Sequence, residues 1–334
     1  MDAEMEGDIS INSEQVLDQY RNLTQTRLRD IMAEYGEPET LYQPMNYVLE
    51  GEGKRIRPLL VLLTNRALGG PEEEALNVAA ALEILHNFTL VHDDIMDEDT
   101  KRRGRPTVHH KWDVSTGILS GDGLLALAYR TLLGAEVKRT PELVRIFTDG
   151  LMEICEGQAL DKEFETRESV SLEEYLEMIS KKTGALLAIC CRMGGMVAAA
   201  NAKTCHLLEE FGYELGKAFQ IQDDLLEVTS TSDVMGKSLG SDLFAQKKTY
   251  VILRALEMAD SETEFNMQQL LNRTSYTSDD FDMLRDYISQ LGVVEETRAK
   301  VEQTIATARG ILRRVDGDMV HVEYLTDRLL QRRS

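Results

Sequence analysis

The feature that most constrains the fold is the stretch Ala75–Val91, in which almost every side chain is apolar. The polar exceptions are Asn77, Glu83, His86, Asn87 and Thr89. Gly69-Gly70-Pro71 and the glutamates Glu72–Glu74 come directly before the stretch, and a proline followed by acidic residues favours a helix start. A helix that is apolar on nearly all its faces must be buried on them. The pattern therefore predicts a central helix inside a larger helical protein.

The composition supports an all-α fold for the whole chain. Six prolines in 334 residues and an aromatic content of 6% are typical of long helices rather than of a turn-rich sheet protein. Ser171 with Glu174 three residues later is a capping box, which predicts another helix start. The apolar content of 43% is enough for a sizeable core. We expect a single domain over residues 1–334, with the acidic, polar residues 1–10 as a disordered tail.

Charge and cysteine content exclude several classes of partner. The formal net charge of −21 argues against nucleic acid and anionic membrane surfaces, because both would be repelled. The stretch Gly184–Ala200 is apolar, but Arg192 interrupts it and its length is marginal for a bilayer, so we expect a buried helix and no transmembrane segment. The four cysteines lack metal-type spacing and no secretory or transit segment is visible, so we expect reduced thiols in the cytoplasm.

Three acids stand at the end of the expected central helix: Asp93, Asp94 and Asp97. A spacing of four places Asp93 and Asp97 on one helix face. Their mutual repulsion and the helix macrodipole both disfavour this arrangement unless a cation neutralises it. Mg²⁺ is commonly held by one or two carboxylates plus the phosphates of a substrate. The motif therefore predicts Mg²⁺ and a diphosphate, although a single such motif also fits a solvated helix end.

The same arrangement recurs at Asp223, Asp224 and Glu227, again at the end of an apolar helical pattern. Two copies favour a pair of metal sites over two solvated helix ends. Two helices that present these acids to each other would line one apolar cavity. The stretch Thr229–Lys248 follows, rich in Ser, Gly, Thr and Asp, and long loops of this kind are usually lids or binding segments.

Two groups of basic residues lie where a diphosphate site would need them. Lys54 and Arg57 are three residues apart, so we expect them on one face of a helical turn. Arg102 and Arg103 follow the first acid motif. Because arginine suits bidentate contacts with phosphate oxygens, these groups predict a site for a second diphosphate.

These ordered motifs resemble those of trans-type isoprenyl diphosphate synthases, the polyprenyl synthetase family, over roughly Tyr42–Thr249. The resemblance implies a helical bundle around a central apolar cavity, a homodimer, and condensation of isopentenyl diphosphate with allylic diphosphates. It implies three Mg²⁺ ions, with metal-linked acids at Asp93, Asp94, Asp97, Asp161, Asp223, Asp224 and Glu227. It implies that isopentenyl diphosphate is bound by Lys54, Arg57, His86 and Arg103.

The same resemblance places further residues on the allylic side, with catalytic roles for most of them: Arg102, Lys182, Thr183, Gln220 and Lys237. It places Asp242 and Lys247 in the loop after the second motif. The implied reaction is head-to-tail: the allylic C–O bond ionises, the alkene of isopentenyl diphosphate attacks the cation, and the released diphosphate takes the proton.

Product length is expected to depend on the two residues that lie five and four positions before Asp93. Phe88 is bulky, Thr89 is small, and in the resembling family an aromatic residue at this place limits the chain. We therefore expect a C20 product, with C15 next, while Phe88 also fits a simple core residue.

Two departures and two alternatives stay open. Glu227 stands where the family usually has Asp, and Gln246 stands where a glycine commonly precedes the loop lysine, Lys247. His86 also fits a core histidine.

An ionising terpene cyclase would share an Asp-rich motif and the helical cavity but would need no second diphosphate site. A non-catalytic subunit that modulates a partner synthase would be expected to lose motif carboxylates, and both motifs are intact here. A prenyltransferase is therefore the favoured function.

Overall fold

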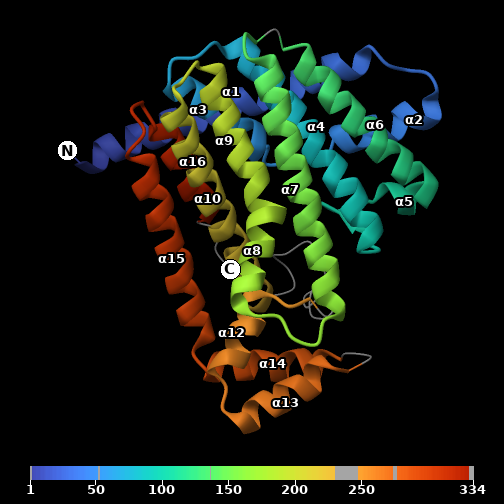
Figure 1. Cartoon of the computed structure of the whole chain (residues 1–334), viewed down its shortest axis with the longest axis vertical. Coiled ribbons are helices and arrows are strands. Elements are labelled where there is room, and N and C mark those ends of the chain that lie inside the picture. The colour runs from blue at the N-terminus through green and yellow to red at the C-terminus, as the bar shows by residue number, and fades with distance from the viewer. Residues whose placement is uncertain (1, 52, 136, 230–246, 274–276, 331–334) are drawn as a thin grey trace. The chain divides into compact units, whose positions relative to one another are not determined.

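The computed structural model describes residues 2–51, 53–135, 137–229, 247–273 and 277–330. Nearly all regular structure in these ranges is helical (Figure 1). The strands within them are β1 (Lys101–Arg102) and β2 (Arg105–Pro106), which pair as a short antiparallel hairpin. The all-α fold expected from the sequence is confirmed.

The chain divides into two compact units, each made of segments that are far apart in the sequence. The first contains Met1–Asp149, Leu186–Gly212 and Ile311–Arg328. The second contains Gly150–Ala185, Tyr213–Gly310 and Leu329–Ser334. Our expectation of one domain over residues 1–334 stays a prediction.

The first unit is assembled around two packed helices, α4 (Glu72–Met96) and α6 (Val114–Leu133), which lie side by side (Figure 1). Helix α3 packs on α4, and α2 packs on α6. The other elements that contribute are α1 (Asp2–Ala33), α2 (Glu39–Leu49), α3 (Ile56–Ala67), α5 (Val108–Lys111), and parts of α7 (Thr140–Thr166), α9 (Ala185–Val197), α10 (Ala202–Thr229) and α16 (Val320–Leu330).

Helix α4 is the central helix that the sequence predicted. Pro71 is its N-cap residue, and Glu72–Glu74 occupy its first turn. Its side chains from Ala75 to Leu85 are mostly fully buried, including the polar Glu83 at 2% exposure. The helix ends at Met96 with Asp97 as the C-cap residue, so the first acid motif lies at its C-terminal end, as expected.

The second apolar stretch also forms a buried helix, α9. Arg192, which interrupts the stretch, forms an ion pair with Glu209 of α10, with 2.6 Å between Nη1 and Oε1. Within the described ranges, no helix has the length and apolar character needed to cross a bilayer.

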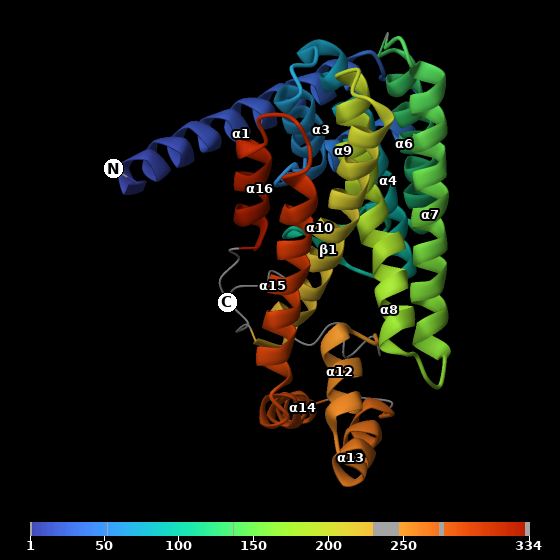
Figure 2. The same ribbon diagram turned by 60° about the vertical axis from the view of Figure 1, so that its left-hand side comes forward.

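The second unit contains the remaining parts of α7 and α10 and the helices that pack on them. These helices are α8 (Leu172–Ile179), the π-helix η1 (Ser180–Gly184), α12 (Tyr250–Met258), α13 (Ser261–Leu271), α14 (Ser278–Gln290) and α15 (Val293–Leu312). Helices α12, α13 and α14 pack together (Figure 2), and α12 also contacts α8. Ser171 and Glu174 form the capping box that the sequence predicted at the start of α8.

Helix α1 extends back to Asp2. The structure thus assigns to a helix the residues 2–10 that we expected as a disordered tail. Each residue added to an existing helix gains one backbone hydrogen bond without a new nucleation step, so a long helix extends readily toward its end.

Candidate functional site

The first acid motif combines one buried carboxylate with two that are half-buried. Asp94 is 5% exposed, whereas Asp93 and Asp97 keep contact with the surface. Asp94 accepts a hydrogen bond from Nε of Arg102, and Nη2 of Arg102 lies 3.4 Å from Oδ2 of Asp99. Burial raises the pKa of Asp94 to about 6, and the charge of Arg102 opposes this rise. The half-buried pair, four residues apart, is therefore the part of the motif with open surface.

A hairpin between α4 and α5 brings Arg102 to the motif. Arg102 pairs with Arg105 across the strands, and the turn residues Arg103 and Gly104 have φ angles of 51° and 74°. Two positive φ values in a two-residue turn define type I′, which matches the twist of paired strands. We did not predict this hairpin from the sequence. The available signal was Gly104, a turn-forming residue between the short segments that pair.

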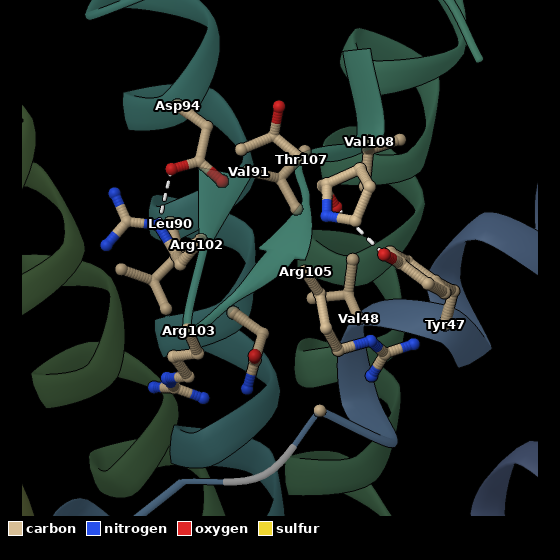
Figure 3. A pocket seen from close by; sticks show the side chains of 13 residues that line it. Tyr47, Val48, Leu90, Val91, Asp94, Arg102, Arg103, Arg105, Thr107 and Val108 are labelled. Carbon is tan, nitrogen blue, oxygen red and sulfur yellow. Dashed lines mark hydrogen bonds and ion pairs between the residues drawn. The ribbon is translucent and has the colours of Figure 1, made fainter. Parts of the chain in front are cut away.

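The hairpin and α4 enclose a small cavity of about 60 Å³ (Figure 3). Apolar side chains of Val48, Leu90, Val91 and Val108 line it together with Asp94 and three hairpin arginines, Arg102, Arg103 and Arg105. The guanidinium of Arg105 lies 3.9 Å from the ring centroid of Tyr47, whose hydroxyl donates to the carbonyl of Pro106. The hairpin is thus fixed at both strands, by Asp94 on one side and Tyr47 on the other.

The expected placement of Lys54 and Arg57 on one helical turn is wrong. Helix α3 begins at Ile56, and the exposed Lys54 lies before it. The cause is Arg55, which adopts a left-handed conformation with a φ of 50°. Its guanidinium donates to the carbonyls of Leu49 and Gly51, both at 2.9 Å, and these bonds hold the chain out of the helix.

Arg55 also forms a buried ion pair that the sequence analysis missed. Its Nη1 lies 2.6 Å from Oε1 of Glu83, and the two side chains are 4% and 2% exposed. Glu83 also attracts the charges of Arg57 and Arg103. One buried carboxylate on α4 therefore lies among three arginines, and an excess of positive charge remains.

Arg57, Arg103 and His86 complete this basic cluster, in which His86 is buried, Arg57 is half-buried and Arg103 is exposed. Partial desolvation lowers the pKa of Arg57 and of Arg103, and burial lowers the pKa of His86 well below its usual range, with Arg57 and Arg103 adding to the effect. His86 is therefore neutral at pH 7. Nε of Arg57 and Nδ1 of His86 are buried, and no described residue forms a hydrogen bond with either atom. Buried donors and excess positive charge are the properties of an anion site.

In the second unit, Lys182 and Thr183 lie in the π-helix η1. Nζ of Lys182 lies 2.5 Å from Oδ2 of Asp161 on α7, and Oγ1 of Thr183 donates to Oε1 of Gln220 on α10 at 3.0 Å. A Cβ at Gly157 would lie 2.3 Å from the backbone nitrogen of Lys182, so only glycine permits this approach of α7. The structure therefore brings together four residues that the resemblance placed on the allylic side or beside it. π-Helical turns are frequent at functional sites.

The second acid motif again buries its middle carboxylate. Asp224 is 3% exposed, Glu227 is 8% exposed and Asp223 is half-buried. Asp224 accepts hydrogen bonds from the Tyr175 hydroxyl, from the backbone N–H of Tyr250 at 2.9 Å, and from Nε2 of Gln220 at 3.1 Å. Neither Tyr175 nor Tyr250 was predicted from the sequence to have a role.

Three other residues affect how the second-unit site is described. Lys237 and Asp242 lie outside the described residues, as does Gln246. Lys247 is half-buried and stands three residues before α12. Gln158 is 9% exposed, and neither of its amide atoms forms a hydrogen bond with a described residue. Gln158 stands three residues before Asp161, no role was predicted for it from the sequence, and its buried amide needs a partner.

The residues expected to control product length lie on α4. Phe88 is 9% exposed, and its ring packs edge to face on His92 with 4.8 Å between centroids. The hydroxyl of the half-buried Thr89 donates to the carbonyl of His86 at 2.8 Å. Phe88 is therefore held by a neighbour one turn along its own helix.

The acid motifs suit Mg²⁺ by their donor chemistry. Across the described ranges, no three His, Cys, Asp or Glu side chains converge on a point that would hold an ion. Mg²⁺ commonly takes one or two carboxylates from a protein and its other ligands from water and substrate phosphates. The half-buried Asp93 and Asp97 supply carboxylate oxygens of this kind at the first motif.

The chain is similar to known proteins along most of its length. The polyprenyl synthetase family matches residues 38–288. A short chain isoprenyl diphosphate synthase of Methanothermobacter thermautotrophicus is 39% identical over 257 residues, which cover 77% of this chain and 79% of that protein. A geranylgeranyl diphosphate synthase of Sulfolobus acidocaldarius is 40% identical over 265 residues, covering 77% and 80%.

Solved structures agree with the sequence relatives. The crystal structure of a geranylgeranyl pyrophosphate synthetase from Pyrococcus horikoshii matches with a TM-score of 0.89 and 31% identity, and the match covers 98% of this chain and 100% of that one. The chain belongs to the polyprenyl synthetase family.

Proposed function

We propose that this protein is a Mg²⁺-dependent prenyltransferase that condenses isopentenyl diphosphate with allylic diphosphates, head to tail, and releases a C20 product. The observation that carries the proposal is the cluster of the buried Arg55, the half-buried Arg57 and the exposed Arg103 around one buried carboxylate, Glu83, in a chain with a net charge of −21. An anion that binds there would compensate the excess of positive charge. A diphosphate is a highly charged anion, and family membership supports it as the ligand.

In this proposal, the first unit binds isopentenyl diphosphate. Arg57 and Arg103 supply guanidinium donors, the neutral His86 supplies a ring nitrogen, and Lys54 adds an exposed charge. Arg102 belongs to the catalytic set, and Asp94 orients it through the ion pair between them.

The second unit binds the allylic diphosphate in this proposal. Lys182, Thr183 and Gln220 act here, Lys182 being oriented by Asp161 and Gln220 by Asp224. Lys237 and Lys247 are assigned to the same substrate by the family resemblance alone. Positive groups at this place favour departure of the diphosphate, because they stabilise the charge that develops on it.

Each acid motif would hold Mg²⁺: Asp93 and Asp97 are its ligands at the first motif, and Asp223 and Glu227 are the acids that face it at the second. Bound Mg²⁺ would act as a Lewis acid toward the departing diphosphate. The proposal includes three Mg²⁺ ions. It also includes a contact between Glu227 and Mg²⁺ that is either direct or mediated by water. Apolar residues of α4 exclude water from the reacting carbons, which protects a carbocation from hydrolysis.

A C20 product is the finer part of the proposal. It is supported by Phe88, which is held against His92, and by the small neighbour Thr89. A chain that grows along α4 would meet the Phe88 ring about one and a half turns below the first motif.

We further propose a cytoplasmic homodimer. No disulfide joins the four cysteines, all of which lie in the described residues, and this supports the compartment. Exposed apolar side chains along α6, namely Val114, Ile118, Leu119 and Leu133, support a helical interface, because such patches mark association surfaces. Sedimentation velocity at several protein concentrations tests the dimer, and a monomer at all concentrations contradicts it.

The experiment for the reaction is an incubation of purified protein with isopentenyl diphosphate and each of the C5, C10 and C15 allylic diphosphates, with and without Mg²⁺. A C20 diphosphate that forms only with Mg²⁺ is the expected result, and Asp93→Ala should abolish it while the circular dichroism spectrum is unchanged. A C15 or longer product would keep the reaction and remove Phe88 as the limit. A cyclic hydrocarbon from the allylic substrate alone, or no turnover by folded protein, would overturn the proposal in favour of a cyclase or a modulating subunit.

A further inference from the structure

The middle carboxylate of the second acid motif is fully engaged by the protein itself. Asp224 is 3% exposed and accepts from three donors on three elements: Tyr175 on α8, Gln220 on α10 and the first residue of α12, Tyr250. Both carboxylate oxygens are used, because Oδ1 faces Gln220 and Oδ2 faces the two tyrosine donors. A buried carboxylate with three donors is well stabilised without a metal ion.

The three donors belong to different elements, so Asp224 connects α8, α10 and the start of α12. The N–H of Tyr250 is one of the donors at the start of α12, so Asp224 acts as a cap for that helix although it belongs to another element. Lys247 lies three residues before this cap. On the same short segment, Nζ of Lys248 donates to the carbonyl of Phe164 at 2.5 Å. The segment that enters α12 is therefore held at Tyr250 and at Lys248.

Gln220 is oriented by the same carboxylate. Because its Nε2 donates to Asp224, its Oε1 points the other way and accepts from Thr183 at 3.0 Å. Without an acceptor at position 224, the amide has no reason to prefer this orientation over the flipped one. Asp224 thus determines which amide atom meets η1.

We propose that Asp224 is a positioning residue rather than a metal ligand: it fixes the entry to α12 and the orientation of Gln220, while Asp223 and Glu227 carry the metal at this motif. The inference rests on the proposed prenyl transfer for its kinetic consequences. The positioning role itself does not rest on that reaction, because the hydrogen bonds to Asp224 form in the protein without substrate or metal.

The test compares Asp224→Asn, Tyr175→Phe and Asp223→Asn with the wild-type enzyme. The measured quantities are kcat, KM for the allylic diphosphate and the Mg²⁺ concentration that gives half-maximal rate. We expect Asp224→Asn to lower kcat about 10- to 100-fold and Tyr175→Phe to lower it about 3- to 10-fold, each with a half-maximal Mg²⁺ concentration within about twofold of wild type. Asp223→Asn should raise that concentration about 10-fold or more.

Tyr175→Phe removes one donor and leaves every carboxylate in place, so it keeps the proposal testable if Asp224→Asn does not fold. A rise in the half-maximal Mg²⁺ concentration of about 10-fold in Asp224→Asn, with wild-type kinetics in Tyr175→Phe, would show a metal ligand and overturn the proposal.

A second readout needs no activity. Hydrogen–deuterium exchange of the metal-free protein should be faster at the Tyr250 amide in Asp224→Asn than in wild type or Asp223→Asn, because only the first variant weakens the acceptor of that amide. Equal protection in all three proteins would contradict the positioning role. Failure of the proposed prenyl transfer would show as a wild-type protein without turnover, and the exchange result would still decide the role of Asp224.

Discussion

The two acid motifs share one pattern but are stabilised in different ways. Both bury the middle acid, Asp94 at 5% exposure and Asp224 at 3%, and both leave the first acid half-buried. Asp94 is paired with a charged arginine from a hairpin, whereas Asp224 accepts from two neutral side chains and a backbone amide of the described residues. The helix geometry selects the buried position, and the neighbouring element decides whether a cation or neutral donors satisfy it.

The wider surroundings of the motifs differ in the same way. In the first unit, Glu83 is a buried carboxylate among three arginines, with Arg57 and His86 holding buried atoms that no described residue contacts by a hydrogen bond. In the second unit, contacts among Thr183, Gln220, Asp224 and Tyr175 form a chain of satisfied hydrogen bonds. The site in the first unit therefore keeps buried polar atoms that a charged ligand can bind. In the second unit, hydrogen bonds between the side chains fix their positions without a ligand.

The largest expected effect comes from the charge balance of the first unit. Glu83→Gln keeps the size of the side chain but leaves Arg55, Arg57 and Arg103 without their buried counter-charge. Removal of one partner from a buried ion pair destabilises a protein by about 3–5 kcal/mol. Urea unfolding of the metal-free variant at pH 7 measures the change.

The matched control for Glu83→Gln is Glu142→Gln. Glu142 also pairs with an arginine, Arg139 at 2.7 Å, but its side chain is 38% exposed. Exposed pairs contribute about 0–1 kcal/mol, so this variant should unfold near the wild-type urea concentration. Equal losses in both variants would contradict the special role of the buried pair.

The next effect concerns the packing that supports η1 in the second unit. Gly157→Ala places a methyl group 2.3 Å from the backbone nitrogen of Lys182, so the backbone of η1 must move. We expect a loss of stability of about 1–3 kcal/mol. Because Lys182 and Thr183 are displaced together, kcat should fall about 100-fold in the prenyl transfer assay.

Gly310→Ala is the control for this substitution. Gly310 lies inside α15, and a Cβ there would meet no atom within 4 Å. The change should stabilise the protein by about 0.5–1 kcal/mol through helix propensity, without an effect on kcat. If Gly157→Ala changed stability and kcat no more than Gly310→Ala does, the close approach of α7 to η1 would not matter for activity.

The smallest effects are opposite pH dependences in the two units. The pKa of Asp94 is raised to about 6, so the folded, metal-free protein binds this proton more tightly than the unfolded chain does. Its contribution is therefore present at low pH and is lost as the pH rises from about 4 to 6. The difference in urea midpoint between wild type and Asp94→Asn, measured in EDTA, should change across this range. A difference that does not depend on pH would contradict the raised pKa.

Glu174 has the opposite sign. The backbone N–H of Ser171, with Arg167, lowers the pKa of Glu174 to about 2. Its stabilisation is present above about pH 4.5 and is lost as the pH falls toward about 2. The difference in urea midpoint between wild type and Glu174→Gln should become smaller as the pH is lowered from about 5 to 3. A difference that grows over this range would contradict the lowered pKa of Glu174.

Local sequence patterns predicted several parts of the structure. The apolar run of α4, the acids at its end and the capping box at Ser171 all depend on residues within one or two turns of each other. The placement of Lys54 on a helical turn failed for the opposite reason. It was decided by carbonyls of Leu49 and Gly51 that bind Arg55 from the preceding segment.

By itself, the sequence determined which helices form, where the acidic and basic groups lie along them, and which family the motifs resemble. The tertiary structure decided which partner each buried group meets: Glu83 with Arg55, Asp94 with Arg102, and Asp224 with Tyr175 and Tyr250. Helix periodicity arises from bonds between residues three or four apart, so it can be recognised in a single sequence. A buried charge is satisfied by whichever donor the fold brings to it, and that donor can be dozens of residues away in the chain.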